Sequence, residues 1–294
     1  MQEENRPKFV IETERIYKSF ETEINLIRQC APSKKTDIQL KDVIVSAYVK
    51  AYDFVLYICR LNDFKDAFFQ IPMLRGICED LITITYLLKQ SEGKQNYLLV
   101  LKRFEELKKS TNAQYIFFNK YNVGQVLPPS INQVDIELIL EEYRKAGHLL
   151  EETKFPTVFK MAKSVNLEDL YSFIYHATSK SVHFDIFTLL SMGWGEIDTN
   201  NGTIKPNFSY QHDYHHYYTF SLFYSSYLFL QQTKNFNNYL ILSQKISDAL
   251  IEIETGYENI DWPELVTFKQ MNIKPPSPLM RSMYRIIQKN ELEE

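Results

Sequence analysis

Glycine is the residue that most limits what this chain can fold into, because it occupies only 8 of the 294 positions. Soluble proteins average about 7% glycine, and folds built from many short strands use it heavily in their turns. The composition is otherwise that of a globular protein, with 45% apolar and 24% charged residues. The sequence therefore predicts an all-α protein with a large core.

The apolar residues recur at helical spacing along most of the chain, which predicts a multi-helix bundle. The run from 41 to 61 is apolar nearly all round and predicts a central helix packed on several sides. A lysine-rich helix over 94–110 is expected on the surface, followed by a long loop over 114–130. A first helix is expected over the apolar stripe 9–27 and ends by Pro32. Further helices are expected over about 67–91, 133–150, 167–192, 212–232 and 235–254.

One segment breaks the helical pattern. Asn201-Gly202 is a strong hairpin turn and stands between two short runs of extended character. We therefore expect one small β-hairpin near residues 195–209, added to the helical bundle.

Charge and hydropathy exclude several classes of protein. With 33 basic and 37 acidic side chains the net charge is -4, so no overall positive field exists to attract nucleic acid or an anionic membrane. The stretch from 214 to 233 has no formal charge and is long enough to span a bilayer. Its two histidines, five tyrosines and three serines indicate a helix buried inside the protein instead, and we expect no membrane contact.

The three cysteines point to a reducing compartment. Cys30, Cys59 and Cys78 are odd in number, far apart and without the spacing of metal ligands. The first residues show no basic-then-apolar signal pattern. We expect a cytoplasmic protein with buried thiols, and no motif for a cofactor is present.

Arg75 and Glu79 stand out because they are charged residues in an apolar helical run. Four residues apart, they share a helix face and can form a pair, and Tyr86 follows two turns later on the same side. Burying the two charges costs roughly several kcal/mol of desolvation free energy unless each is paired or hydrogen-bonded. The pair is therefore either part of a functional site or a structural ion pair that ties helices together.

Tyr175, Ser179 and His183 fall at i, i+4 and i+8 of the helix expected over 167–192, so they would form a polar strip. The strip could present a phenol, a hydroxyl and an imidazole to one space. The alternative is that His183 is a core histidine and that Ser179 bonds back to its own helix.

Together these residues resemble a known family. The pattern R-x-x-x-E with a following Y-L-L, then Y-x-x-x-S-x-x-V-H, resembles a large bacterial family of helical proteins catalogued as a domain of unknown function. The resemblance covers roughly residues 40–230, which leaves a C-terminal helical extension over about 235–294 of a single domain, 1–294. Some members look similar to the HEPN superfamily of ribonucleases, which act in abortive infection and toxin systems.

The resemblance implies a metal-independent ribonuclease of bacterial stress or phage defence. His183 would act as general acid or base, Arg75 would stabilise the phosphorane and Glu79 would orient one of them, while Tyr86, Tyr175 and Ser179 would bind substrate. HEPN ribonucleases carry arginine and histidine on one helix, whereas the helix of His183 has no arginine. Arg75 would therefore have to come from a second helix.

A non-catalytic module is the rival hypothesis. The same polar side chains could bind a nucleotide-like or phosphate-bearing ligand, or a protein partner, without chemistry. RNA or a nucleotide is the ligand that we expect, and a homodimer is a further expectation, since uncharged aromatic helices are suitable interfaces.

A metal site is a weaker alternative. His212 and His216 are four residues apart near an expected helix start, as two ligands of one metal would be. No third ligand follows by spacing, so we expect a wet or interfacial helix end and no metal.

Overall fold

The computed structural model describes residues 8–29, 40–61, 63–128, 133–145, 154–191, 196–197, 202–205, 207, 209–240, 242–258, 260–268, 271, 273–277, 279–281, 283–284 and 287. The chain divides into two compact units, Met1–Asp261 and Trp262–Glu294. The single domain expected over 1–294 stays a prediction.

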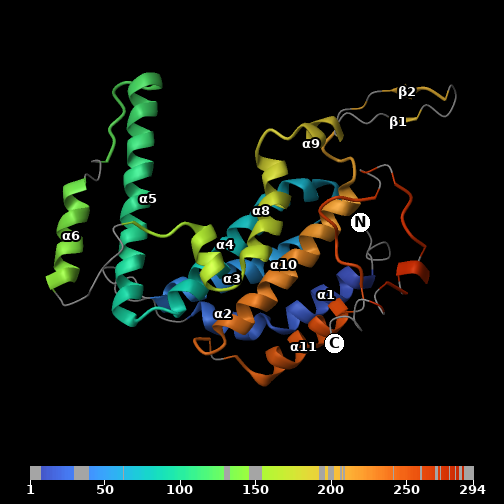
Figure 1. Ribbon diagram of the computed structural model, residues 1–294, viewed down its shortest axis with the longest axis horizontal. Coiled ribbons are helices and arrows are strands. Elements are labelled where there is room, and N and C mark those ends of the chain that lie inside the picture. The colour runs from blue at the N-terminus through green and yellow to red at the C-terminus, as the bar shows by residue number, and fades with distance from the viewer. Residues whose placement is uncertain are drawn as a thin grey trace. The chain divides into compact units, whose positions relative to one another are not determined.

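The first unit is built from helices (Figure 1). In chain order its elements are α1 (Lys8–Ser19), α2 (Glu21–Arg28), α3 (Leu40–Cys59), the 3-10 helix η2 (Phe64–Gln70), α4 (Ile71–Leu88), α5 (Glu92–Tyr121), α6 (Gln133–Lys145), α7 (Val158–Ser164), α8 (Glu168–Val182), α9 (Ile186–Ser191), β1 (Glu196–Ile197), β2 (Ile204–Lys205), α10 (Tyr214–Phe236) and α11 (Gln244–Glu258).

Helix α10 forms the centre of the first unit. It packs against α3, α4 and η2, and it crosses α3 closely in Figure 1. Phe229 of α10 stacks on Tyr48 of α3 with ring centroids 4.7 Å apart, and both rings are buried. The prediction that the uncharged stretch 214–233 is an internal helix is confirmed. Among the described residues no helix is long and apolar enough to cross a membrane.

Helix α3 is buried on several sides, as its all-round apolar pattern predicts. It packs against α1, α2, α4 and α10. Tyr52 of α3 donates a hydrogen bond to the Tyr17 carbonyl of α1 at 2.9 Å. The buried Tyr52 hydroxyl therefore has a hydrogen-bond partner.

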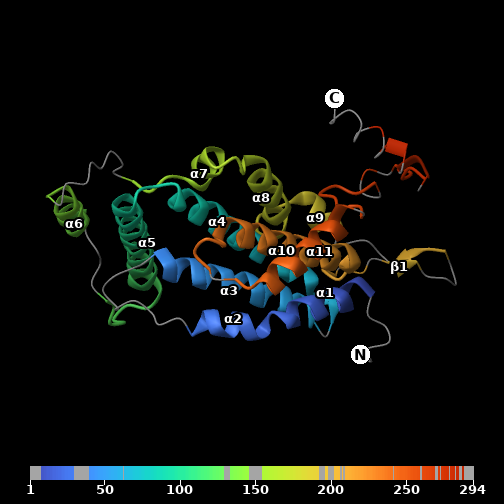
Figure 2. The ribbon, with the colours of Figure 1, turned by 90° about the horizontal axis from the view of Figure 1, so that it is seen from below.

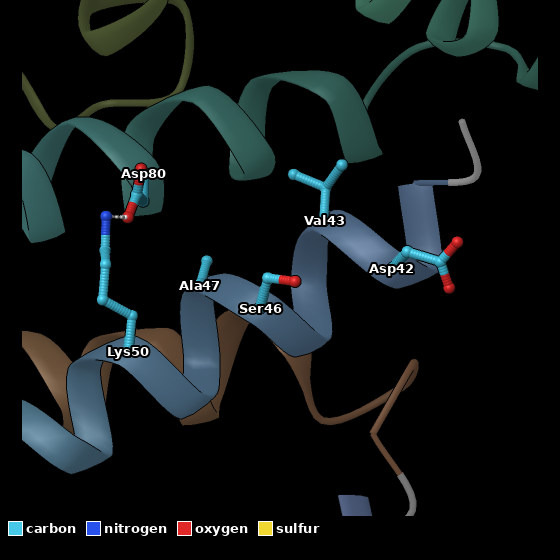
Figure 3. Close-up of a pocket in the computed structure, with 6 residues that line it drawn as sticks. All are labelled: Asp42, Val43, Ser46, Ala47, Lys50 and Asp80. Atoms are coloured by element: carbon cyan, nitrogen blue, oxygen red, sulfur yellow. Dashed lines mark ion pairs between the residues drawn. The ribbon is translucent and has the colours of Figure 1, made fainter. Parts of the chain in front are cut away.

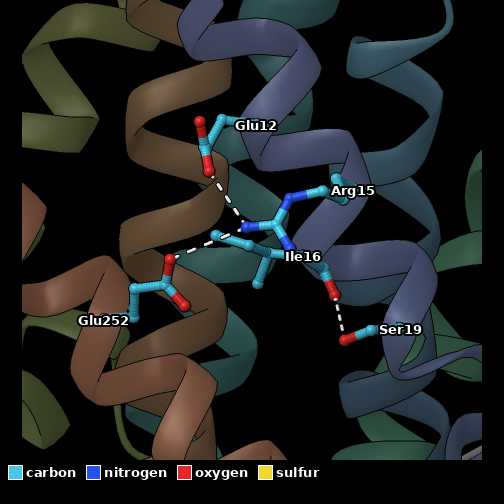
Figure 4. A network of polar contacts seen from close by, with 5 residues as sticks. All are labelled: Glu12, Arg15, Ile16, Ser19 and Glu252. Atoms are coloured by element: carbon cyan, nitrogen blue, oxygen red, sulfur yellow. Dashed lines mark hydrogen bonds and ion pairs between the residues drawn. The ribbon is translucent and has the colours of Figure 1, made fainter.

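Surface charges connect α1 to α11 (Figure 4). The Nη2 of Arg15 donates to Oε1 of Glu12, one turn earlier, at 2.9 Å and lies 3.7 Å from Oε1 of Glu252 on α11. In the same helix the Ser19 hydroxyl donates to the Ile16 carbonyl at 2.7 Å. All three charged side chains are well exposed, so the ion pairs add little to stability.

Helix α5 is longer than its sequence pattern predicts. The prediction of a loop over 114–130 is wrong for residues 114–121, because α5 continues to Tyr121. After Gly93 in the first turn, no glycine or proline follows until Gly124, which has φ of +98°, so neither residue type stops the helix earlier. Figure 2 shows α5 next to α6 at one end of the first unit.

The single helix expected over 167–192 is wrong, because it is two helices. Helix α8 ends at Val182, and α9 begins at Ile186. Asp185 explains the break, because its Oδ1 accepts the Thr188 amide at 2.7 Å and so caps α9. An N-cap residue has non-helical φ and ψ, so Asp185 cannot also belong to a helix that continues from α8.

The predicted fold class needs a correction at residues 195–209. The described residues there pair only as Glu196 with Lys205 and Ile197 with Ile204. This contact involves two residues on each side, whereas a hairpin is marginal even at ordinary strand length. The β-hairpin expected as a component of the fold is therefore not supported, and the described fold is an all-α bundle.

The second unit, Trp262–Glu294, holds a small local cluster. The Arg281 guanidinium lies over the Phe268 ring at 5.8 Å. Its Nε donates to the Pro276 carbonyl at 3.3 Å.

Candidate functional site

Arg75, Glu79 and Tyr175 of the predicted site lie where α4 packs against α8. Arg75, in the first half of α4, contacts Tyr175 in the second half of α8. Near the other end of α4, Lys89 donates to the Ser164 carbonyl, just before α8 begins, at 3.3 Å. The two helices therefore run antiparallel, which brings together residues 100 positions apart in the sequence.

The predicted pairing of Arg75 with Glu79 is confirmed. The Arg75 Nε donates to Oε1 of Glu79 at 2.8 Å, and the guanidinium carbon lies 4.6 Å from the centroid of the Tyr175 ring. The carboxylate raises the pKa of Arg75, with the hydrogen bond as the main cause. The guanidinium is therefore charged and fixed by two neighbours.

The Arg75–Glu79 pair is not sealed inside the protein. The side chains of Arg75 and Glu79 are 33% and 31% exposed. A guanidinium has five N–H donors, and within the described residues only the Nε donor of Arg75 is hydrogen-bonded. Both Nη groups are thus available to an incoming acceptor.

A second aromatic ring extends the surface next to Arg75. The Tyr171 and Tyr175 rings are 5.7 Å apart on successive turns of α8. Burial raises the pKa of Tyr171, and the negative charge of Glu79 adds to this effect. Tyr171 is therefore a neutral phenol beside the guanidinium at physiological pH.

Two other predicted residues lie on the same two helices as this group. Ser179 is one turn beyond Tyr175 on α8, and its hydroxyl is buried without a hydrogen-bond partner among the described residues. The bond back to its own helix is made instead by Thr178, which donates to the Ile174 carbonyl at 2.8 Å. Tyr86 is half-buried on α4, roughly 10 Å along the axis from Glu79.

His183 does not belong to the polar strip predicted for α8. It is the C-cap of that helix, in extended conformation with φ of -114° and ψ of 167°, so the i+8 geometry does not apply. Its side chain is exposed. No hydrogen bond or ring contact connects it to Arg75 within the part of the chain that the structure describes.

A histidine that the sequence pattern did not single out contacts the Tyr175 ring. His176 is exposed, and its ring meets the Tyr175 ring edge-on with centroids 5.8 Å apart. The Arg75 guanidinium contacts the same Tyr175 ring, so the imidazole and the guanidinium share one neighbour. The spacing pattern passed over His176 because it is adjacent to Tyr175 in sequence.

A second charged group lies between α3 and α4 (Figure 3). Lys50 of α3 forms an ion pair with Asp80 of α4, and both line a cavity of about 340 Å³ with Ser46. Burial raises the pKa of Asp80, and Lys50 only partly opposes this. The available signal was the presence of Lys50 and Asp80 within otherwise apolar helical runs.

The predicted histidine pair is arranged differently from two ligands on one helix. Helix α10 begins at Tyr214, so His212 lies before its start. The His212 Nε2 is 2.7 Å from the Asn207 carbonyl. In the described part of the chain, no three His, Cys, Asp or Glu side chains are close enough to hold a metal ion.

The fold and the site define the class of the protein as an all-α bundle with a partly exposed, anchored guanidinium between two antiparallel helices. A family model, the family of unknown function DUF5677, matches residues 41–202. The match covers more than half of the chain and includes α4 and α8, so the chain belongs to this family.

The match confirms the predicted membership in a family of unknown function, although it ends before the limit of about 230 expected from the resemblance. No curated protein and no solved structure matches the chain. Similarity to HEPN ribonucleases, a bacterial defence role and a cytoplasmic location stay predictions.

Proposed function

We propose that the surface formed by Arg75, Tyr171 and Tyr175 binds a phosphate-bearing, nucleotide-like ligand. The observation that carries the proposal is the state of Arg75, whose Nε is anchored by Glu79 while both Nη groups have no described partner. A guanidinium fixed at one edge can offer its other edge to two phosphate oxygens. Because the side chain is already ordered, binding costs less conformational entropy.

The neighbouring side chains suit such a ligand. Tyr175 holds the guanidinium plane from one side, and exposed His176 adds a ring with hydrogen-bonding nitrogens at the rim. Glu79 orients Arg75 and partly neutralises it, which favours a ligand that also makes apolar or aromatic contacts.

Isothermal titration calorimetry with AMP, ATP and inorganic phosphate tests this proposal. Arg75→Gln removes the charged fork, and we expect the affinity for AMP and ATP to fall about 10- to 100-fold, the range for a hydrogen bond to a charged group. Arg15→Gln is the matched control, because Arg15 also pairs with a glutamate on its own helix but lies on α1. Unchanged affinity in Arg75→Gln, or no binding by the wild-type protein, would contradict the proposal.

Ribonuclease activity remains the second candidate, favoured by the exposed imidazoles of His176 and His183 on or next to α8. A labelled RNA incubated with the wild-type protein, with and without EDTA, tests for metal-independent cleavage. Comparing His183→Ala with His176→Ala then identifies the histidine that acts as general acid or base. Ligand binding without cleavage would leave the non-catalytic module as the function.

A further inference from the structure

The outer part of α5 is a surface that the Arg75 site does not use. Buried residues of α5 end at Leu101, and no residue from 102 to 121 is buried. The apolar side chains Ile116, Phe117 and Tyr121 are 74%, 55% and 65% exposed. Five turns of helix thus project with one face uncovered by the described residues.

This segment differs in charge from the rest of the chain. Residues 102–121 contain five basic and two acidic side chains, a net charge of +3 within a chain of net charge -4. A local positive patch therefore exists even though the protein as a whole is acidic. Such a patch attracts phosphates of a nucleic acid backbone.

The aromatic and basic side chains interleave on the same face of α5. The Phe117 and Tyr121 rings are 4.9 Å apart on successive turns, and the Lys120 ammonium lies 5.1 Å from the Tyr121 ring centroid. At 100° per residue, Lys109 and Lys120 fall within about 20° of each other around the axis. Exposed Ile116 lies about 20° to one side of Lys109 and Phe117 about 80° to the other, so the lysines lie between apolar side chains. Both lysines are exposed.

The mixture of aromatic and basic side chains on one face favours one kind of partner over another. A helix that lies in a membrane interface segregates its apolar face from its charged face, whereas binding of single strands combines stacking rings with cations along one groove or face. We propose that the face of α5 formed by Lys109, Phe117, Lys120 and Tyr121 binds single-stranded nucleic acid. The rings stack on bases and the lysines contact phosphates.

Lysines that contact phosphates and rings that stack on bases do not distinguish ribose from deoxyribose, so RNA and DNA strands are expected to bind alike. The proposal is independent of the Arg75 site, since it uses other residues on another helix.

Fluorescence anisotropy with labelled U20 RNA and labelled dT20 DNA tests the proposal at low and moderate salt. Phe117→Ser/Tyr121→Ser should weaken binding about 5-fold or more, because base stacking on one ring contributes at least about 1 kcal/mol. Lys109→Gln/Lys120→Gln should reduce the slope of log affinity against log salt by roughly 1.4, for two contacts to a single strand. All four positions are exposed, so circular dichroism should show unchanged helix content.

Two controls separate this surface from other sites. Lys160→Gln/Lys163→Gln removes the same charge from exposed positions on α7 and should leave the affinity for U20 within about twofold. Arg15→Gln, at an exposed position on α1 outside both proposed surfaces, should also leave it unchanged. The titration with AMP reports on the Arg75 site separately, so failure of one proposal does not imply failure of the other.

The proposal is overturned if the wild-type protein does not bind U20 at low salt, or if the two α5 double variants bind it as the wild type does. It is also overturned if vesicles of phosphatidylcholine and phosphatidylserine bind the protein through Phe117 and Tyr121 while U20 does not.

Discussion

Lys50 and Asp80 connect α3 to α4 through charges in a partly buried setting. The Asp80 side chain is 30% exposed, and Lys50 is the described cation that pairs with it. Removing one partner of a buried pair leaves the other charge uncompensated. At this partial exposure we expect Lys50→Met to lower the free energy of unfolding by about 1–2 kcal/mol at pH 7, measured by urea denaturation.

This loss should depend on pH in a defined direction. Burial raises the pKa of Asp80 in the folded state, so Asp80 contributes fully to stability below about pH 4 and that contribution is lost as the pH rises through the raised pKa. Lys50→Met removes the opposing charge, so its penalty should shrink from pH 7 towards pH 4. Lys102→Met, which breaks an exposed pair with Glu106, should lower the free energy of unfolding only slightly at either pH, and an equal loss in both variants would contradict the prediction.

Arg75 makes one contact that residue spacing predicts and one that it does not. Its pairing with Glu79 follows from the helical repeat alone, because i and i+4 share a face. Its contact with Tyr175 depends on the antiparallel packing of α4 and α8. No local pattern encodes a contact between residues so distant in sequence.

The break between α8 and α9 changes which residues can belong to the candidate site. Asp185 starts α9, so α8 ends at Val182 and His183 leaves the strip formed by Tyr175 and Ser179. Helical spacing predicted all three on one face because it assumed an unbroken helix. The aspartate two residues after His183 was the signal that a new helix begins.

Asp185→Ala should destabilise the start of α9. The loss of the capping bond to the Thr188 amide costs about 0.5–2 kcal/mol, and hydrogen exchange by mass spectrometry should show faster exchange in residues 186–191. Thr157→Ala removes the cap of α7 and serves as the comparison, because it should speed exchange over 158–164 and leave α9 unchanged. Unaltered exchange of α9 in Asp185→Ala would contradict the assigned cap.

In the core of the first unit, buried tyrosines of other helices form hydrogen bonds with α10. Tyr17 donates to the Ser226 carbonyl at 3.4 Å, and the Tyr48 hydroxyl is 3.0 Å from Oγ1 of Thr233. Burial raises the pKa of both phenols, and it raises the pKa of Tyr52 to about 12. The folded core therefore requires neutral phenols.

This arrangement predicts alkaline unfolding. Unfolded tyrosine ionises near pH 10, so stability is fully present below pH 10 and is lost as the pH rises towards 12. Each such tyrosine should remove about 1.4 kcal/mol of unfolding free energy per pH unit in that window. Urea denaturation at pH 8, 10 and 11 checks this, and a flat profile up to pH 11 would contradict it.

Tyr52→Phe should make the alkaline slope shallower by the contribution of one group, although it also loses the bond to the Tyr17 carbonyl. Tyr121→Phe is the matched control, because Tyr121 is 65% exposed on α5 and should leave the slope unchanged.

The sequence by itself determined that this protein is helical, that 41–61 and 214–233 are internal helices, and that Arg75 pairs with Glu79. These features follow from glycine scarcity and from apolar and charged spacing within one helix, which are local properties of the chain. The stacking of Arg75 on Tyr175, the ion pair of Lys50 with Asp80 and the exposed face of α5 were decided by tertiary structure. Each depends on which helices pack together and which do not, and side-chain spacing along one helix carries no information about its neighbours.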